Sequence, residues 1–544
     1  MKKSSFIEGT LIATFAIVFT KILGMFYVIP FYAMVGVQGS ALYAYAYNIY
    51  VIFLDISSAG LPIAVSKIIN EYHTLGMMDA KMRAFHICKK IMIFVAVISF
   101  IVLFLFAGGI ASILLGDLSG GNTIEDVTIA IRSVSFAILI VPFLSVTKGY
   151  LQGHRIINVS SISQVIEQIV RISIILIGCY LILKVFGGSV RSAVCLSVFG
   201  AFVAGCVAYL YIRIKINKDK NINFDKEYPK DSISDKEITK KLFLYAIPFI
   251  IINIVSSLYN FVDMTLVLRT MNHLGMDAGD VEFITSAVST WAPKINMIIT
   301  SVAMGMSTSL IPTIVTAWTK GEMNEVNNRF NQALQLIIFI SLPMAIGISL
   351  LSKSIWTIFY GYNRMGSRIL SLSVFAGLLL NLYMTTESAL QGMNKFKLVY
   401  LSTIIGFASN ILLDVPLMYL YKIIGFYPYL GSVTATIIGY SLSIIITLLI
   451  LRKECNIHYR KSIKLVLKMM IPLLCMIGSV LFFMNIIPHD YGRLSCVIYV
   501  VINAFIGALV YFVISYKMGI IDMVLGKGNI KKFIKKLTFN KISN

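Results

Sequence analysis

The sequence predicts an all-α integral membrane protein with about fourteen transmembrane helices. Hydrophobic residues make up 58% of the 544 residues and charged residues only 13%, about half of the roughly 25% that is typical of a soluble domain. Apolar runs of about 20 residues recur along the chain, and a helix of that length crosses a hydrocarbon core roughly 30 Å thick. The two-residue alternation of an outer-membrane β-barrel is not evident.

The apolar runs set the expected spans in chain order. They cover residues 6–30, 40–66, 86–107, 127–150, 157–183, 190–214, 241–268, 283–316, 329–351, 368–390, 397–421, 428–451, 463–487 and 493–517. The basic start of the chain resembles a signal peptide. Glu8 and Lys21 interrupt the first run, however, and no small-x-small cleavage site follows, so we expect a retained helix. The run at 283–316 is too long for one straight crossing, and we expect it to tilt or to extend past the membrane.

Charged loops predict the orientation of the chain. The formal net charge is +22, but Lys and Arg cluster in short loops on one side of the spans, which encodes membrane topology and does not call for a nucleic-acid partner. The loops on the other side are poor in basic residues and carry Asp117, Glu125, Asp126, Asp277, Asp280 and Glu282. We therefore expect a multi-pass membrane protein with both termini in the cytoplasm; a bacterial plasma membrane as its location is implied only by the resemblance described below.

Two short blocks suggest an internal repeat. "GYLQGHRI" at 149–156 links the fourth and fifth spans, and "SALQGMNK" at 388–395 links the tenth and eleventh in the same way. Two repeats of six spans run in the same direction, so a pseudo-two-fold axis along the membrane normal would relate them, with a binding site between the halves. The predicted parts are an N-terminal lobe at 1–214, a charged cytoplasmic linker at 215–240, a C-terminal lobe at 241–452, two additional helices at 453–520 and a basic cytoplasmic tail at 521–544.

Motifs of soluble enzymes are missing from the sequence. It contains no P-loop, no HExxH, no GxSxG and no His/Cys cluster with metal-ligand spacing. The seven cysteines are scattered and form no CxxC pair, so we expect buried thiols and neither a disulfide framework nor a zinc site. The chain is therefore not expected to be an enzyme or to hold a cofactor, and a coupling cation or the membrane potential would supply any driving force.

Ionisable residues at membrane depth are the candidates for function, because such residues usually line a substrate or ion pathway. The candidates are Lys21, Asp55, Glu167, Arg171, Asp263, Lys294, Glu387 and Asp414. Lys21 lies roughly 22 Å from the cytoplasmic start of its span, and Lys294 lies roughly 16 Å from the outer start of its span. Two cations near mid-depth, one in each lobe, suit an anionic ligand. Pairing with a nearby carboxylate or snorkelling to the interface is the plainer alternative.

The remaining candidates have competing explanations. Glu167 and Arg171 are four residues apart, so they face the same side of one helix and are expected to pair there, which lowers the cost of burial. Substrate binding by the two is the alternative. Asp263, Glu387 and Asp414 suit cation or proton sites, because coupling ions use carboxylates inside the membrane, and pairing or helix capping explains them equally well.

Three segments resemble a known family. "TKILGMFYVIPFYAMVG" (20–36), "GLPIAVSKIINEY" (60–72) and "LQGHRIINVSSISQVIEQIVRIS" (151–173) are similar to the lipid-flippase branch of the multidrug/oligosaccharidyl-lipid/polysaccharide exporter superfamily. The resemblance is closest to the YtgP-type MurJ flippases and next to stage V sporulation protein B. It implies fourteen helices in two lobes around a central cavity, and translocation of lipid II, the undecaprenyl-pyrophosphate-linked peptidoglycan precursor. The last two helices would then form a groove for the prenyl tail.

The resemblance also implies roles for single residues. The family carries a basic residue in the first helix, after Ser or Thr and before an apolar pair and Gly, which Lys21 matches, and another in the eighth helix, where Lys294 falls. Both are usually Arg in the family, and Lys binds pyrophosphate as a point charge without the bidentate fork of Arg. Tyr27 and Asp55 stand near positions that hold further Arg residues in the Gram-negative members.

A lipid II flippase that works by alternating access is therefore the leading hypothesis, and an exporter of another polyprenyl-linked oligosaccharide (teichoic acid, capsule or spore-cortex precursor) is the alternative. A drug/cation antiporter ranks third. A glycosyltransferase or acyltransferase would need a catalytic residue in a sizeable outer loop, and none is evident. The expected partners are the lipid-linked substrate, the bilayer and the machinery of cell-wall synthesis.

Overall fold

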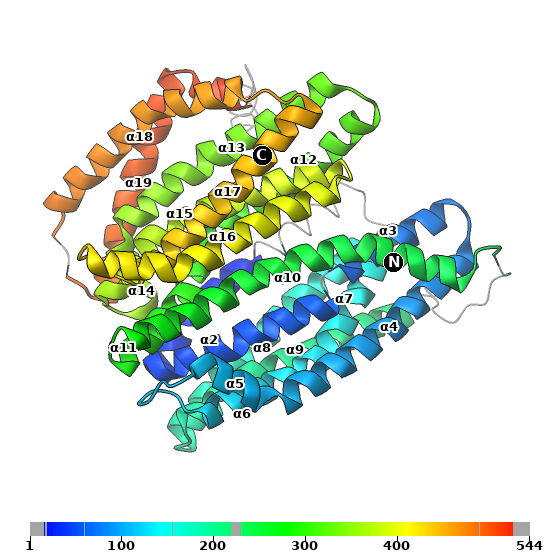
Figure 1. The fold of residues 1–544 in the computed structure, drawn as a ribbon, viewed down its shortest axis with the longest axis horizontal. Helices are drawn as coiled ribbons and strands as arrows, with labels where there is room; N and C mark the ends of the chain where they lie inside the picture. The colour runs from blue at the N-terminus through cyan, green and yellow to red at the C-terminus, as the bar shows by residue number, and fades with distance from the viewer. Residues whose placement is uncertain are drawn as a thin grey trace, which may run out of the picture. The chain divides into compact units, whose positions relative to one another are not determined.

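The computed structural model describes residues 16, 19–58, 60–154, 156–218, 229, 231–488 and 490–525, and its regular structure there is helical (Figure 1). Twelve helices of the described part are long and apolar enough to cross a membrane. One of them, Phe19–Ser58, has 40 residues and runs through the first two predicted spans. The all-α membrane fold is confirmed, and the number of fourteen crossings stays a prediction. The start of the first predicted span, much of the linker and most of the tail lie outside the described residues.

The chain divides into two compact units, Met1–Trp291 and Ala292–Asn544. The first unit contains α2 (Val28–Ser58), α3 (Leu61–Thr74), α4 (Met78–Leu105), α5 (Ala107–Leu115), α6 (Ile124–Ser135), α7 (Ala137–Gly153), α8 (Ile157–Tyr180), η1 (Leu181–Val185), α9 (Val190–Asn217), α10 (Asp235–His273), α11 (Ala278–Ser286) and η2 (Ala287–Trp291). The second contains α12 (Ala292–Thr319), α13 (Met323–Leu350), α14 (Ser352–Tyr360), α15 (Arg364–Gly392), α16 (Phe396–Ile423), α17 (Leu430–Cys455), α18 (Arg460–Ile486), α19 (Arg493–Lys517) and α20 (Ile520–Leu525). The two units are defined by contacts between residues, whereas the predicted lobes are defined by the sequence repeat. The lobe boundaries therefore stay a prediction.

A kink within α2 separates the first two predicted spans. Gly36 has φ of 68° there, and the helix continues on both sides of it. Only glycine adopts this backbone conformation without strain. The two spans are therefore joined by a bend instead of a loop. The second predicted span is also interrupted, because α2 ends at Ser58 and α3 begins at Leu61, with Pro62 in its first turn.

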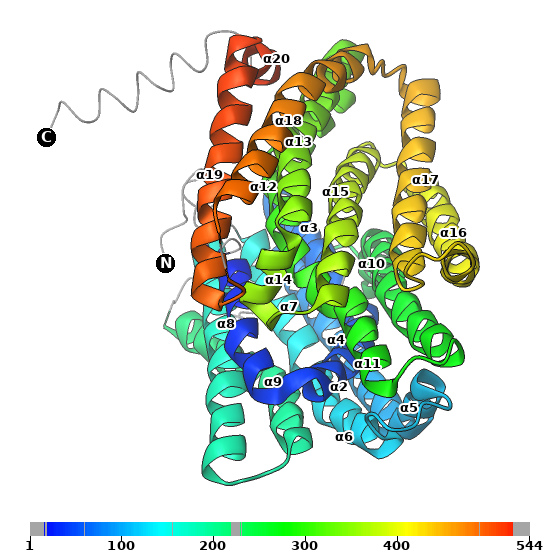
Figure 2. The same cartoon turned by 90° about the vertical axis from the view of Figure 1, so that its left-hand side faces the viewer.

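Each unit contains a helix hairpin, that is, two neighbouring helices joined by a short connection. In the first unit α8 and α9 lie side by side in Figures 1 and 2, joined by a turn in which Gly187 has φ of 61°. In the second unit α18 and α19 form a similar pair (Figure 2).

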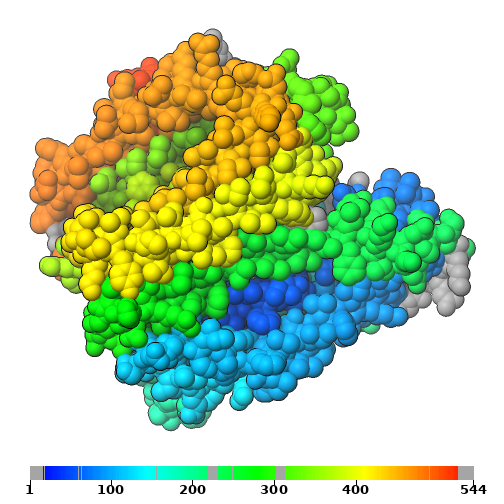
Figure 3. Space-filling view, viewed as in Figure 1, coloured from blue at the N-terminus to red at the C-terminus, as the bar shows by residue number. Residues whose placement is uncertain are grey.

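Large apolar side chains cover the outer surface of the long apolar helices. On α4, which lies on the face drawn in Figure 3, Phe94 is 68% exposed and Leu105 is 65% exposed, as expected of a surface that faces lipid tails.

Glycines allow two close helix crossings in the first unit. A Cβ atom on Gly149 would lie 2.5 Å from the carbonyl oxygen of Pro62, and one on Gly153 would lie 2.8 Å from Cβ of Ile69. Gly149 and Gly153 are four residues apart, so they form the small-xxx-small pattern that lets membrane helices approach backbone to backbone. The "GYLQG" part of the repeat block is therefore the contact surface of α7 on α3.

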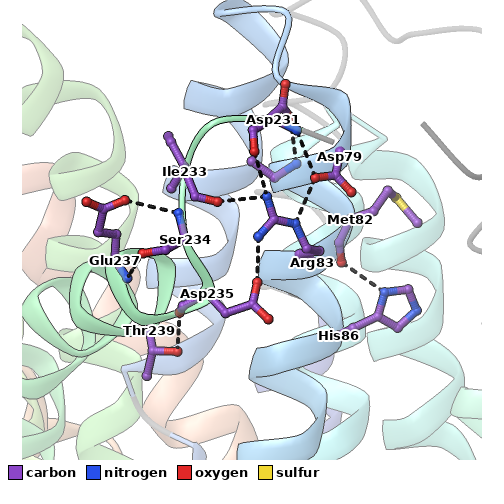
Figure 4. Close-up of polar contacts among 11 residues, drawn as sticks. Asp79, Met82, Arg83, His86, Asp231, Ile233, Ser234, Asp235, Glu237 and Thr239 are labelled. Carbon is purple, nitrogen blue, oxygen red and sulfur yellow. Dashed lines mark hydrogen bonds and ion pairs between the residues drawn. The ribbon is translucent and has the colours of Figure 1, made fainter. Parts of the chain in front are cut away.

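A cluster of charged residues fastens the start of α10 to α4 (Figure 4). The Arg83 guanidinium donates to Asp79 at 2.8 Å, to Asp235 at 2.6 Å and to the carbonyl oxygen of Ile233 at 2.8 Å. The backbone amide of Ala80 donates to Asp231 Oδ2 at 2.8 Å. One arginine therefore holds the end of the linker and the N-terminal turn of α10 against the start of α4.

An Arg83→Met substitution is expected to raise amide hydrogen exchange at residues 231–240 about tenfold, because the hydrogen bonds of one charged group hold this segment. Lys90→Met removes one exposed positive charge from the same helix and serves as the matched control. Hydrogen-exchange mass spectrometry of both variants measures the effect. Equal exchange at 231–240 in Arg83→Met and in the wild type would show that other contacts hold the segment.

Candidate functional site

Lys21 lies on a short helix, residues 19–26, that packs against α8. The contact is close at Gly24, because a Cβ atom there would lie 3.1 Å from Nε2 of Gln168. Lys21 precedes Gly24 by three residues and so shares its helix face, and Arg171 follows Gln168 by three on α8. Lys21 is partly buried. The predicted cation of the first span therefore faces the helix that carries the predicted charge pair.

The predicted ion pair between Glu167 and Arg171 does not form, so that expectation is wrong. Glu167 Oε2 instead accepts from Lys148 Nζ on α7 at 2.7 Å, and Arg171 Nη2 donates to Gln168 Oε1 at 2.8 Å. Spacing along one helix could not reveal Lys148, because the partner comes from the neighbouring helix. Glu167 is therefore neutralised across the α7–α8 contact, and the Arg171 guanidinium has a neutral amide as its hydrogen-bonding partner.

Tyrosines of α2, together with Tyr27 in the turn before it, lie near the Arg171 guanidinium. Tyr43, Tyr47 and Tyr27 are among the groups that interact with it electrostatically. The Tyr27 and Tyr43 hydroxyls lie 3.3 Å apart, and the rings of Tyr43 and Tyr47 stack with their centroids 5.7 Å apart. The sequence analysis missed this cluster. Its signal is "YAYAYNIY", which places Tyr43, Tyr47 and Tyr50 on one helix face at the spacing i, i+4 and i+7.

These contacts assemble a basic site in the first unit. Lys21, Lys148 and Arg171 contribute basic side chains. Glu167 contributes a carboxylate, which is paired with Lys148. Tyrosine hydroxyls, an amide and ammonium groups are all hydrogen-bond donors. An anion with several oxygen atoms would find both charge and directional donors there.

The other candidates of the first unit lie on α2 and α10. Asp55 of α2 accepts a hydrogen bond from the Ser257 hydroxyl of α10, so it links two helices. Asp263 of α10 is 5% exposed. Nearby on the chain, Met264 Sδ lies 3.7 Å from Nδ2 of Asn48, which also donates to the Thr290 hydroxyl at 2.8 Å. A polar strip thus runs through the contact between α2, α10 and η2.

Glu282 lies outside the long apolar helices, where α11 meets the loop before α6. Its Oε1 accepts from the Asn122 backbone amide at 2.6 Å and from the Asn122 side chain at 2.8 Å. Burial raises the pKa of this carboxyl above its ordinary value, although both bonds from Asn122 lower it. Asn122 also donates to the Gln38 carbonyl at 3.0 Å, so the residue joins α11 to the bend of α2.

The predicted long span at 283–316 is not one regular α-helix. Helical structure runs without a break from α11 through the π-helix η2 into α12, which begins at Ala292. Lys294 follows the π-helical turn directly, next to Pro293, and is partly buried. π-Helical segments frequently occur at functional sites. The turn therefore changes the helix register just before Lys294, which lies within a helical run in the second unit.

Glu387 is buried between α15 and α16. It is 3% exposed and accepts a hydrogen bond from the Thr403 hydroxyl. The Tyr383 hydroxyl lies 2.9 Å from the same Thr403 oxygen. This closed group of hydroxyls and one carboxyl satisfies the buried acid without a basic partner among these contacts.

Asp414 is fully buried on α16. Asn410, one turn earlier, donates to the Thr436 hydroxyl of α17 at 3.2 Å, and its Oδ1 is buried without a hydrogen-bond partner among the described residues. Asp414 thus follows, by one turn of α16, an amide that contacts a hydroxyl of α17, and carboxylate, amide and hydroxyl oxygens are ligands that suit a hard cation. In the described part of the chain no group of three or more His, Cys, Asp or Glu residues could hold a metal ion.

Comparison with known families and structures identifies the fold and the family. The polysaccharide biosynthesis protein family matches residues 6–318, and the MatE family matches residues 248–416. Among solved structures, a lipid II flippase MurJ in an inward closed conformation matches with a TM-score of 0.69 at 18% identity, over 94% of this chain and 99% of that one. An inward-facing multidrug-resistance MATE transporter matches with a TM-score of 0.63 at 16% identity, over 80% of this chain and 94% of that one.

Two relatives show more closely to which family the chain belongs. The lipid II flippase MurJ of Bacillus subtilis (strain 168) is 32% identical over 537 residues, which cover 96% of this chain and 97% of the relative. Stage V sporulation protein B of the same organism is 22% identical over 75% of this chain and 76% of that protein. Both agree with the resemblance seen in the sequence. The chain therefore belongs to the family of the lipid II flippase MurJ, a family of membrane transporters within the polysaccharide biosynthesis proteins.

Proposed function

We propose that this protein translocates lipid II across the cytoplasmic membrane by alternating access. The observation that carries the proposal is the 32% identity with a lipid II flippase over nearly the full length of both chains. The fold agrees with it, because a solved lipid II flippase superposes over 94% of this chain. A membrane-embedded basic site, which the first unit contains, suits the anionic pyrophosphate of such a cargo.

The basic site of the first unit would bind the pyrophosphate. An anion loses its hydration when it leaves water, and this loss must be offset by charge and hydrogen bonds. Lys21 offers a point charge, whereas Arg171 offers a planar fork that matches two phosphate oxygens. Lys294 of the second unit is proposed as a further substrate-binding cation. Asp55 and Glu167 would tune this field, Glu167 through Lys148.

Transport would be driven by an ion gradient or by the membrane potential, with buried carboxylates as the coupling groups. Asp263, Glu387 and Asp414 are the candidates, and Asp414 is favoured because it is fully buried on α16 and lies one turn from the polar contact of Asn410 with Thr436. Orientation with both termini in the cytoplasm, and contact with cell-wall synthesis enzymes, belong to the same proposal.

An Asp414→Asn substitution tests the coupling. Asparagine keeps the size and hydrogen-bonding capacity of the side chain but removes its charge. We expect translocation in proteoliposomes to lose its dependence on an imposed Na⁺ or H⁺ gradient, with at least a tenfold drop in the gradient-driven rate. Ser409→Ala, which removes a partly buried hydroxyl that donates to the Ile405 carbonyl oxygen of the same helix, is the control. A fully gradient-dependent Asp414→Asn protein would exclude this carboxylate.

Depletion of a bacterium's own lipid II flippases tests the function and the two lysines together. Cells that express this chain should grow, and those that express Lys21→Ala or Lys294→Ala should grow poorly or not at all. Lys21→Arg and Lys294→Arg should grow, because they retain the charge. Failure of the well-expressed wild type to rescue growth would favour an exporter of another polyprenyl-linked oligosaccharide. Full growth of both Ala variants would overturn the roles of the lysines and leave the flippase proposal standing.

A further inference from the structure

A pocket in the first unit lies away from the basic site just described. Side chains of α4, α7 and α9 enclose about 100 Å³. By comparison, a single water needs roughly 10–15 Å³, so a group the size of a phosphate fits. The polar lining consists of His86 and Lys89 from α4, Thr147 from α7 and Tyr209 and Arg213 from α9.

Positive charge in this pocket is not neutralised by protein. The lining includes three basic side chains and no carboxylate. Lys89 Nζ lies 5.1 Å from the centroid of the Phe143 ring, and within the described residues neither Lys89 nor Arg213 forms an ion pair. His86 Nδ1 lies 3.0 Å from the Met82 carbonyl oxygen (Figure 4). Because a carbonyl only accepts, Nδ1 carries the hydrogen of that bond and the opposite ring nitrogen is left for another partner.

The pocket lies where the membrane begins on the side that the basic loops predict to be cytoplasmic. Lys89 and Lys90 directly precede the apolar run of α4, and Arg213 directly follows that of α9. Exposed apolar side chains lie one turn away on the same helix faces, with Ile93 at 48% and Leu210 at 58% exposure. A ligand in the pocket would therefore have its charged part at the interface and its apolar part beside these side chains.

We propose that this pocket binds the phosphodiester of an anionic glycerophospholipid from the surrounding bilayer. Basic pockets between membrane helices on the cytoplasmic side suit such headgroups. Arg213 would take two phosphate oxygens through its planar fork, Lys89 would supply a point charge, and the Tyr209 hydroxyl would add a donor. The Thr147 hydroxyl already donates to the Phe143 carbonyl oxygen at 2.9 Å, so it lines the pocket without donating to the ligand. The bound lipid would bridge α4 and α9. This ligand is a bilayer lipid and not the cargo, so the inference does not depend on the proposed function.

Native mass spectrometry of the full-length protein in detergent tests the proposal, with phosphatidylglycerol and phosphatidylcholine as probes. Phosphatidylcholine carries a cation that the basic lining would repel. We expect the wild type to bind phosphatidylglycerol about tenfold more tightly than phosphatidylcholine, and Lys89→Gln with Arg213→Gln to remove this preference. Arg213→Gln alone serves as a milder second variant, and retention of the detergent-solubilised monomer peak shows that each variant is folded.

The matched control is Lys90→Gln with Lys215→Gln. It removes the same charge from the same two helices, at exposed positions that do not line the pocket, and should change phosphatidylglycerol binding less than twofold. Equal loss of phosphatidylglycerol binding in both double variants would show that the overall positive charge of this surface, and not the pocket, causes the preference. That result would overturn the proposal. Inorganic phosphate, titrated alone by calorimetry, should not bind measurably. Binding as tight as that of the lipid would make the pocket a site for soluble anions, which also overturns it.

Discussion

An Arg171→Gln substitution is expected to lower the rate of lipid II translocation at least tenfold while the protein remains folded. The guanidinium has Gln168 as its hydrogen-bonding partner and tyrosines around it, so its charge remains available to an anion. Hydrogen bonds to a charged group contribute roughly 1.5–3 kcal/mol each, and loss of one already corresponds to about tenfold or more. Translocation of lipid II in proteoliposomes, together with growth of flippase-depleted cells, measures the effect.

Because Glu167 is paired with Lys148, the effect of Arg171→Gln on transport can be separated from an effect on stability. Removal of Arg171 leaves no carboxylate newly unpaired, because Lys148 still neutralises Glu167 at 2.7 Å. The thermal stability of Arg171→Gln should therefore stay near that of the wild type, whereas Lys148→Gln should lower it by leaving Glu167 without its cation. Arg171→Lys should retain part of the rate, since it keeps the charge and loses the fork. Wild-type translocation by Arg171→Gln would remove Arg171 from the site.

A Gly149→Val substitution is expected to prevent folding of the first unit. The first carbon of the new side chain would lie 2.5 Å from the Pro62 carbonyl oxygen and 2.8 Å from its Cα. Backbone atoms cannot turn away as a side chain can, so α3 and α7 must separate, at an expected cost of about 3 kcal/mol or more. Yield of the detergent-solubilised monomer and its unfolding temperature report the effect.

Gly109→Ala is the matched control for this substitution. Gly109 lies in α5 of the same unit, and a Cβ atom there meets nothing within 4 Å. Alanine favours a helix by roughly 0.8–1 kcal/mol over glycine when nothing obstructs it, so this variant should be at least as stable as the wild type. A stable, monomeric Gly149→Val protein would mean that α3 and α7 can separate freely, and would contradict the assigned role of the glycine pair.

Most of the fold follows from rules that act along one helix. Length and apolarity predicted the spans, because a bilayer sets both, and the capping box at Ser234 and Glu237 marks the start of α10. The structure differs from these predictions where the backbone departs from a regular α-helix. Gly36 turns two expected spans into one kinked helix, and the π-helix η2 divides an apolar run that looked continuous.

The candidate site was harder to predict, because it depends on contacts between helices. Glu167 and Arg171 satisfied the spacing rule for a pair, but the rule does not include Lys148 on another helix. The same limit hid the tyrosines of α2 and the pocket of α4, α7 and α9. The roles of the predicted residues stay predictions, and the structure adds partners for some of them, such as Lys148 for Glu167 and Ser257 for Asp55.

The glycine crossing of α3 and α7 also bears on how such transporters can diversify. The "LQG" of this block begins one of the segments that resemble the lipid-flippase branch, yet Gly149 and Gly153 pack closely against α3 and leave no room for a ligand at the crossing. The presence of this block in a chain therefore indicates how the helices of the transporter pack and not which molecule it carries. A new cargo would require changes on α2 and α8, around Tyr43 and Arg171, while the crossing stays as it is. Two proteins that share this block can thus export different lipids, and only the residues facing the cargo would distinguish them.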